Sequence, residues 1–234
     1  MGEILSVREL WVEYGDHTTA LRGIGFALAE GERVGLLGPN GAGKTSLLLA
    51  LMRGVSSRGG IVVDGVELSR RTADRARSRC GMTFQNSDDQ LFMPTLLDDV
   101  AFGPLNQGLP AEQAEAAARS AIAAVGLAGL EGRSAHHLSG GQKRNAALAT
   151  ILSMRVKILL LDEPGANLDH RGRQRLIELL DARREAMLLA THDLPMVRRL
   201  CTRVLVLDAG RIVADGPADQ VISDSAFMEQ HGLG

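Results

Sequence analysis

Short apolar runs alternate with helical segments along most of the chain. Alternating or continuous apolar positions predict strands at residues 4–12, 24–28, 33–37, 61–68, 80–84, 158–161, 186–191, 204–207 and 212–214. Helical periodicity and capping signals predict helices at residues 43–52, 94–108, 112–125, 145–154, 172–180 and 194–200, and one or two short helices at 218–230. Strands that alternate with helices are typical of an α/β fold.

Two regions depart from simple alternation. The first strands follow one another through turns such as Glu30-Gly31-Glu32, which favours an antiparallel β subdomain. Helices dominate residues 86–154, which favours an inserted α-helical subdomain. We expect one domain over residues 1–234, with a core at about 1–85 and 155–234 and the helical subdomain at about 86–154.

Composition narrows the class of protein. The chain has 234 residues and is 45% hydrophobic, which is enough to bury one well-packed domain. Its net charge of −2 provides no general attraction to nucleic acid. No signal peptide is expected, and no apolar run reaches the length of about 18 residues that spans a membrane, so a membrane role is expected to come through a partner. The two cysteines, Cys80 and Cys201, predict reduced thiols in a cytosolic protein.

A glycine-rich segment after the strand at 33–37 fits the phosphate-loop pattern GxxxxGK[ST]. Its glycines allow backbone N–H groups to line up on phosphate oxygens, its lysine supplies a charge, and its threonine offers a hydroxyl to Mg²⁺. The preceding strand and following helix argue against a chance glycine-rich turn. The predicted nucleotide-binding residues here are Gly38, Pro39, Asn40, Gly41, Ala42, Gly43, Lys44, Thr45 and Ser46.

Two carboxylates follow the apolar strand at 158–161. The carboxyl ends of parallel strands are where α/β folds bind ligands. We expect Asp162 to hold the Mg²⁺ shell and Glu163 to polarise the attacking water. Without the phosphate loop, an acidic turn at the end of a strand would be the better interpretation.

Three more polar residues lie at ends of predicted elements. Gln85 follows the strand at 80–84, and its amide can reach the metal or the water. His192 follows the strand at 186–191 and can contact the γ-phosphate and Glu163. Asp169 precedes the helix at 172–180 and can cap it as well as serve the nucleotide. Alone, each of these residues would more simply be structural.

Residues 138–142, with the sequence LSGGQ, precede an Ala-rich helical stretch. Adjacent glycines usually weaken a helix. At a helix N-terminus, however, Ser139, Gly140, Gly141 and Gln142 offer backbone N–H groups, a hydroxyl and a positive dipole end, which suit an anion.

The motifs occur along the chain in a fixed order: the phosphate loop, Gln85, LSGGQ, the ILLLDEP stretch at 158–164, Asp169 and His192. In this combination of motifs, the chain resembles the ATP-binding cassette (ABC) family over nearly its full length. The resemblance implies a head-to-tail pair of cassettes. Each ATP would lie between the phosphate loop of one subunit and the LSGGQ of the other. The resemblance also implies that Tyr14 stacks on adenine.

Residues 84–92, FQNSDDQLF, and 98–104, DDVAFGP, resemble the cobalt and energy-coupling-factor (ECF) importer ATPases. This resemblance implies an ATP-hydrolysing subunit for import of cobalt, nickel or a vitamin. Its partners would be a second, identical or similar ATPase, a transmembrane coupling subunit and a substrate-binding membrane subunit. These partners would hold it at the cytoplasmic face of the membrane.

Some features depart from the family pattern or stay open. Gly165 stands where Ser or Thr is commoner, Asn145 stands where Arg or Gln is commoner, and the long C-terminal regulatory domain of some relatives is not expected. Five arginines at positions 70, 71, 75, 77 and 79 are expected to form a solvated helix face, with anionic lipid or a membrane partner as the alternative.

Two other functions compete with transport. A soluble ATPase acting on nucleic acid or ribosomes would belong to the same superfamily, but its repair and chromosome branches carry long insertions that the segment between Thr45 and Ser139 cannot hold. A phosphate-loop kinase would leave LSGGQ without a role.

Overall fold

The computed structural model describes residues 2–233, which divide into two compact units. Of these residues, the first unit holds 2–82, 157–162 and 184–233, and the second holds 83–156 and 163–183. The helix expected at residues 172–180 therefore belongs to the second unit, together with the helical segment, and not to the core as the sequence suggested.

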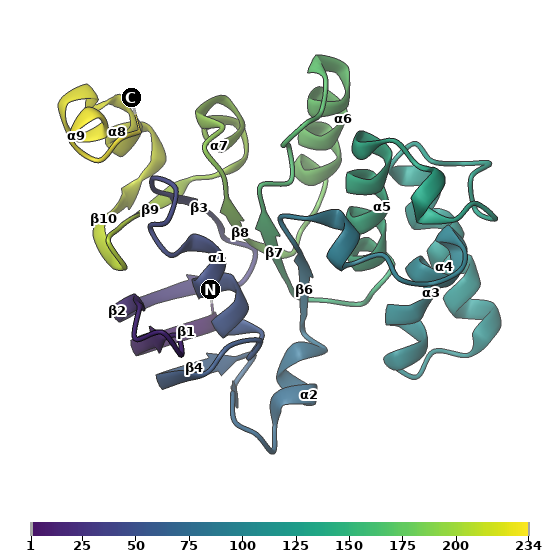
Figure 1. The fold of residues 1–234 in the computed structure, drawn as a ribbon, viewed down its shortest axis with the longest axis horizontal. Coiled ribbons are helices and arrows are strands. Elements are labelled where there is room, and N and C mark those ends of the chain that lie inside the picture. Colours follow the sequence, from purple (N-terminus) through teal and green to yellow (C-terminus); the bar gives the residue numbers. More distant parts are fainter. Residues whose placement is uncertain (1, 234) are drawn as a thin grey trace. The chain divides into compact units, whose positions relative to one another are not determined.

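The first unit contains a six-stranded sheet in the order β10-β9-β3-β8-β7-β6 (Figure 1). β3 (Arg33–Leu37) is parallel to β8 (Ala186–Ala190) and β9 (Arg203–Asp208), and β8 is parallel to β7 (Ile158–Asp162). β10 (Arg211–Pro217) adds an antiparallel edge, and β6 (Cys80–Thr83) forms the other edge. β7 and β8 are buried at every position, as is typical of parallel strands covered on both faces.

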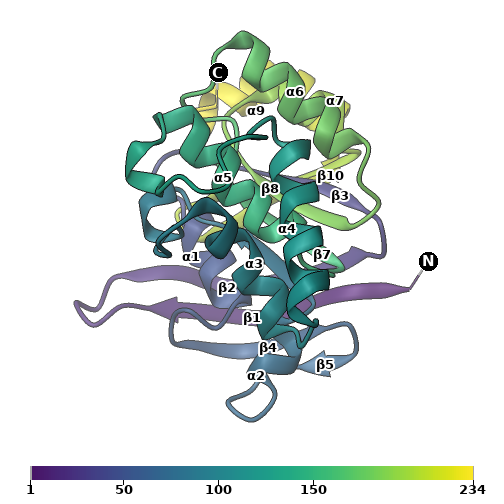
Figure 2. The ribbon, with the colours of Figure 1, turned by 90° about the vertical axis from the view of Figure 1, so that its right-hand side faces the viewer.

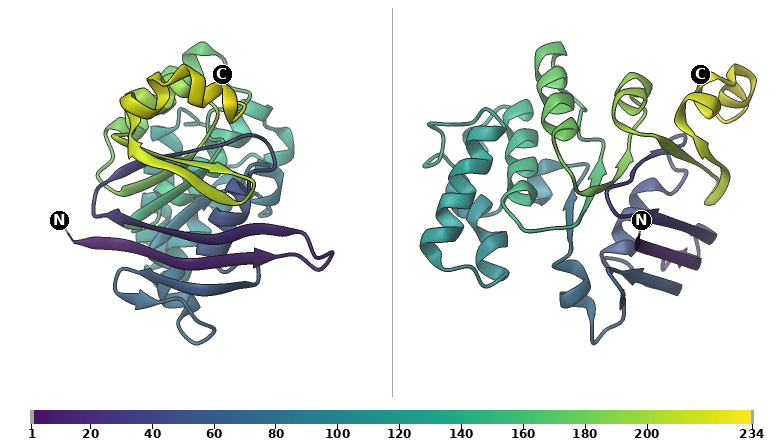
Figure 3. Two further views of the ribbon diagram at one scale, coloured as in Figure 1. Left: turned by 90° about the vertical axis from the view of Figure 1, so that its left-hand side faces the viewer. Right: turned by 180° about the vertical axis from the view of Figure 1, so that it is seen from behind.

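A second, antiparallel sheet in this unit has the order β2-β1-β4-β5. Its strands are β1 (Glu3–Glu13), β2 (Thr19–Ala29), β4 (Ser57–Val63) and β5 (Val66–Glu67). The two long strands β1 and β2, purple in Figure 3, run side by side. β2 begins at Thr19 and not at residue 24, because its pairing with β1 continues to Glu13 through positions that lack an apolar pattern.

The helices of the first unit are α1 (Lys44–Leu51), α2 (Ala73–Arg77), α7 (Leu194–Leu200), α8 (Ala218–Ser223) and α9 (Ser225–Gln230). The structure confirms only in part that the arginine cluster is a solvated helix face, because α2 carries just Arg75 and Arg77 of the five. Arg77 donates to the carbonyl of Met52 at 2.8 Å, and Arg79 lies 3.3 Å from the carboxylate of Asp64. Only the other three arginines of the cluster are exposed.

The second unit contains α3 (Leu96–Asn106), α4 (Ala111–Ala124), α5 (Gly140–Leu152) and α6 (His170–Asp181). Two 3-10 helices, η1 (Ser87–Asp89) and η2 (Ala135–His137), accompany them. The helices α3, α4 and α5 pack on one another (Figure 2). The sequence pattern predicts the four α-helices but neither of the 3-10 turns.

A proline inside α3 explains one contact between helices. Pro104 has no N–H, so the carbonyl of Val100 loses its partner in the helix. The hydroxyl of buried Ser153, at the end of α5, donates to this carbonyl at 2.7 Å. The proline therefore creates a buried acceptor that ties α3 to α5.

Candidate functional site

The strand register aligns the ends of three parallel strands in the first unit. Leu36 of β3 lies opposite Ala190 of β8, and Ala190 lies opposite Asp162 of β7. The segments that follow these positions therefore leave the sheet at the same edge. They are the glycine-rich phosphate loop, the loop that carries His192, and the acidic end of β7.

The phosphate loop, residues 38–45, has a backbone that requires glycine. Gly38 has φ 153, and a Cβ atom there would collide with the carbonyl oxygen of Leu207. Gly210, in the turn after β9, has φ 77 and donates its N–H to the carbonyl of Ala42 at 3.1 Å. The β9–β10 turn thus braces the loop, a contact that the sequence analysis does not predict.

The ammonium group of Lys44 lies inside the phosphate loop. Its Nζ donates to the carbonyl oxygens of Gly38 at 2.6 Å and Pro39 at 3.0 Å. These contacts curl the lysine back over the loop instead of extending it into solvent. A positive charge held in a glycine-rich phosphate loop is an arrangement that suits a polyphosphate.

Thr45 and Asp162 come together although they are far apart in sequence. The hydroxyl of Thr45 donates to Oδ2 of Asp162 at 2.8 Å, and Asp162 is buried. A hydroxyl and a carboxylate side by side are oxygen ligands that fit Mg²⁺, which commonly takes few protein ligands and completes its shell with water and phosphate. Within residues 2–233, no cluster of three or more His, Cys, Asp or Glu side chains is placed to hold a metal.

The predicted adenine-stacking residue lies near the start of α1. The hydroxyl of Tyr14 is 2.9 Å from the hydroxyl of Ser46, which follows the phosphate loop. The tyrosine is 39% exposed, so its ring is accessible to a ligand. This contact brings Tyr14 to the phosphate loop, as its predicted role requires.

His192 lies on the exposed loop between β8 and α7 in the first unit. The next residue, Asp193, caps α7 by accepting from the N–H of Met196 at 2.9 Å, and its own N–H donates to Thr191 at 3.1 Å. These bonds fix the backbone on either side of the histidine. The imidazole is therefore presented from a structured loop.

The LSGGQ segment forms the N-terminus of α5 in the second unit. The hydroxyl of Ser139 accepts from the N–H of Gln142 at 3.3 Å, and Oε1 of Gln142 accepts from the N–H of Ser139 at 2.9 Å. This reciprocal capping box explains why α5 begins at Gly140 and not at residue 145 as predicted. Accepting a bond leaves the serine hydroxyl its own hydrogen to donate.

Gln85 and Glu163 lie in the second unit, and an arginine outside the predicted site holds both backbones. Glu163 has φ 47, an unusual conformation for a residue with a side chain. Arg144 donates to the carbonyl oxygen of Glu163 at 2.9 Å and to that of Gln85 at 3.0 Å. This arginine directly follows the LSGGQK segment.

Two other polar residues organise the surroundings of these groups. Asp169 caps α6 by accepting from the N–H of Gly172 at 2.7 Å, which confirms its predicted capping role. Gln90 accepts from the N–H of Phe84 at 3.1 Å and donates to the carbonyl of Ala147 at 2.9 Å. Gln90 lies within the FQNSDDQLF string, which could have drawn attention to it in the sequence. Its bridging role could not be predicted, because it depends on a contact with α5 that only the folded chain makes.

The departure at position 145 has a structural role. Nδ2 of Asn145 donates to the carbonyl of Val125, at the C-terminal end of α4, at 3.0 Å. The side-chain amide of this asparagine, which belongs to α5, thus caps the C-terminal end of α4.

The environment of the two cysteines does not favour nucleophilic chemistry. Both are free and buried, and burial raises the pKa of Cys80 and of Cys201 to about 12. Thiols of this kind are poor nucleophiles at neutral pH.

The predicted site residues therefore fall into two sets. The first unit holds the phosphate loop, Ser46, Tyr14, Asp162 and His192. In this unit, Thr45 of the loop contacts Asp162, and Ser46, which follows the loop, contacts Tyr14. Gln85, Glu163, Asp169 and the LSGGQ residues belong to the second unit.

Comparison with known proteins points to a single family. The family model described as ABC transporter matches residues 21–166. A protein of Gloeobacter violaceus, described no more specifically than as an ABC transporter ATP-binding protein, is 49% identical and is aligned over 100% of this chain and 97% of its own length. The energy-coupling factor transporter ATP-binding protein EcfA of Methanocaldococcus jannaschii is 41% identical over 98% of this chain and 85% of its own.

Solved structures agree in fold. The CbiO1 protein of Clostridium perfringens, part of the ABC transporter complex CbiONQ, matches with a TM-score of 0.82 and 33% identity over 100% of this chain and 96% of that chain. A dimeric ATP-binding cassette with bound ADP and phosphate matches with a TM-score of 0.84 over 92% of this chain and 98% of that chain. At 22% identity, the second likeness concerns the fold alone.

Proposed function

Because the chain belongs to the ABC transporter family of ATPases, we propose that it is the energising subunit of an ECF-type importer for cobalt, nickel or a vitamin. The FQNSDDQLF and DDVAFGP strings support the ECF assignment, as do the similarities to EcfA and CbiO1. The observation that carries the ATPase role is the 2.8 Å contact between Thr45 of the phosphate loop and the buried Asp162.

Each residue near the phosphate loop has a distinct part in this proposal. Lys44 neutralises charge on the β- and γ-phosphates of ATP. Thr45 and Asp162 would hold Mg²⁺, which when bound neutralises phosphate charge and orients the γ-phosphate. Tyr14 would pack its ring on the adenine.

The remaining catalytic residues act on the water and the γ-phosphate. The Glu163 carboxylate would accept a proton from the attacking water, and Gln85 would position that water or bind the metal with its amide. His192 would donate a hydrogen bond to the γ-phosphate. Asp169, next to the segment that follows Glu163, would support the nucleotide site of the dimer.

The LSGGQ segment supports a dimer. Its serine hydroxyl and glycine N–H groups lie at the exposed N-terminus of α5, where they suit an anion. We place the γ-phosphate of a partner subunit's ATP there, contacted by Ser139, Gly140, Gly141 and Gln142. The partner is a second copy or a close paralogue.

An exposed aromatic patch in the second unit supports a membrane partner. Phe92 and Phe102 meet edge to face with their ring centres 5.1 Å apart, and Phe92 is 65% exposed. The side chain of Asp99 holds this loop by accepting hydrogen bonds from the N–H groups of Phe92 and Met93. Burial raises the pKa of Asp99, and these two bonds act in the opposite direction by favouring its charged form. Such a patch suits a helix of the coupling subunit.

The membrane partners account for the proposed location. In the part of the chain that the structure describes, no helix is long and apolar enough to cross a bilayer. Contact with a coupling subunit and a substrate-binding subunit would place this chain at the cytoplasmic face of the membrane. The transported substrate would be bound by those subunits.

Replacing Glu163 tests the proposal. Glu163→Gln should lower kcat for ATP hydrolysis by about 100-fold or more, since a positioned general base typically contributes that much. ATP should still bind, because Lys44 and Thr45 are unchanged. Light scattering after gel filtration with ATP and Mg²⁺ should then show a stable dimer.

Glu178→Gln is the matched control, because Glu178 is an exposed glutamate of α6 in the same unit. It should hydrolyse ATP like the unaltered protein. Hydrolysis at the normal rate by Glu163→Gln would show that Glu163 is not the base, and a monomer that retains ATP would contradict the proposed dimer.

A further inference from the structure

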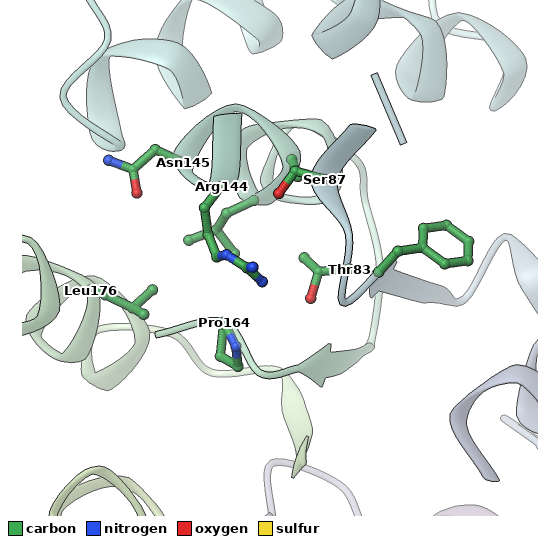
Figure 4. Close-up of a pocket in the computed structure, with 9 residues that line it drawn as sticks. Thr83, Ser87, Arg144, Asn145, Pro164 and Leu176 are labelled. Carbon is green, nitrogen blue, oxygen red and sulfur yellow. The ribbon is translucent and has the colours of Figure 1, made fainter. Parts of the chain in front are cut away.

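Arg144 contacts two backbones that carry proposed catalytic side chains. One terminal nitrogen of its guanidinium donates to the Glu163 carbonyl at 2.9 Å, and the other donates to the Gln85 carbonyl at 3.0 Å. Figure 4 shows the guanidinium pointing between Thr83, next to the glutamine segment, and Pro164, next to Glu163. One side chain thus spans two segments far apart in sequence.

The surroundings of Arg144 favour a fixed geometry. The cavity beside it has a volume of about 10 Å³, which holds at most one water molecule. The guanidinium is planar and always charged, so its donors keep a set spacing. The bond to the Glu163 carbonyl is partly buried, and the bond to the Gln85 carbonyl is exposed.

Both of these contacts go to backbone atoms. Through them, Arg144 fixes the peptide groups of Gln85 and Glu163. The φ of 47 at Glu163 is a conformation that persists only where the surroundings hold it. An arginine donor on its carbonyl is one such restraint.

Arg144 also belongs to the helix that carries LSGGQ. α5 begins at Gly140, so Ser139 and Arg144 are separated by little more than one helical turn. If the N-terminus of α5 contacts the partner's ATP, as the proposed function states, then a shift of this helix moves the peptide groups of this chain's own Gln85 and Glu163.

We propose that Arg144 is a positioning residue that couples the two ATP sites of the dimer. This inference rests on the proposed dimeric ATPase. ATP bound at LSGGQ of one chain sets, through Arg144, the placement of the water-activating residues of that same chain. Those residues act on the other ATP.

Arg144→Gln tests the coupling. Since misplacement of a catalytic group by about 1 Å costs on the order of 100-fold, we expect kcat to fall by about 10- to 100-fold. The Hill coefficient for ATP should fall to about 1, because the sites no longer influence each other. ATP affinity and ATP-dependent dimer formation should stay unchanged, as the phosphate loop and LSGGQ are intact.

Arg144→Lys should recover part of kcat, because a lysine can reach one carbonyl but cannot span both. Arg119→Gln and Arg119→Lys are matched controls, since Arg119 lies in the same unit and pairs with Glu115 on the exposed surface of α4. These controls should keep the normal kcat and Hill coefficient. Melting temperatures of all four variants separate a folding defect from a loss of coupling.

Three results would overturn the inference. Arg144→Gln could hydrolyse ATP with unaltered kcat and cooperativity, or lose kcat only in proportion to the fraction of folded protein. Arg144→Lys could also match the glutamine variant in every parameter. A failure of the proposed function would look different, because the unaltered protein would then neither hydrolyse ATP nor dimerise with it.

Discussion

Lys44 shows how a single side chain can be prepared for its ligand before the ligand arrives. Its ammonium already lies against the carbonyls of Gly38 and Pro39. Binding of phosphate would exchange these neutral acceptors for charged oxygens, which form stronger hydrogen bonds with an ammonium group. Little side-chain order then has to be created on binding.

Lys44→Ala should weaken ATP binding by about 1.5–3 kcal/mol, the usual contribution of a hydrogen bond to a charged group. Isothermal titration calorimetry with ATP would measure the loss. Lys157→Ala is the control, because Lys157 belongs to the same unit and pairs with Asp64. Equal affinities of Lys44→Ala and the unaltered protein would contradict the placement of phosphate in the loop.

Contacts between elements give α3 and α5 their fixed relation within the second unit. Pro104 leaves the Val100 carbonyl without a helical partner, and the Ser153 hydroxyl replaces it. A buried carbonyl without a donor would carry a desolvation cost. The serine and the proline are therefore expected to act as a pair.

Ser153→Ala should lower the free energy of unfolding by about 1–3 kcal/mol, because it leaves this acceptor unsatisfied. Urea denaturation followed by circular dichroism would measure it. In a Pro104→Ala background the backbone regains an N–H, so the same serine change should cost clearly less. Equal costs in both backgrounds would show that the serine and proline are not linked.

Elements with local signals are the ones that sequence predicts well. The apolar strands β7 and β8, the phosphate loop and α4 have patterns that identify them without knowledge of the fold. The start of β2 does not, because polar residues there are held only by pairing with β1. The Gly210 brace and the Arg144 contacts are also unpredicted, since each joins segments that only the folded chain brings together.

For the whole molecule, the central question is what its two units do in a dimer. The first unit holds the phosphate loop and Asp162, and the second holds LSGGQ, Gln85 and Glu163. In the proposed dimer, each ATP needs a phosphate loop from one chain and LSGGQ from the other. Hydrolysis and binding should then respond differently to a change at LSGGQ.

Ser139→Arg should lower kcat by about 100-fold or more, since loss of a donor that stabilises the transition state costs that much. ATP affinity of the monomer should stay near normal, because the phosphate loop is untouched. Radioactive phosphate release and equilibrium dialysis measure the two quantities. Ser120→Arg, on the exposed surface of α4, is the control, and equal loss of binding and hydrolysis in Ser139→Arg would argue against a shared site.

The β9–β10 turn that supports the phosphate loop has a consequence for how the protein is made. β3, which leads into the loop, has β8 and β9 as its neighbours, and Gly210 supports Ala42. During synthesis, these partners emerge from the ribosome long after the loop itself. The nascent chain therefore cannot complete its nucleotide-binding fold until the segment through Gly210 has been translated, so folding of the phosphate loop depends on residues made much later than the loop itself.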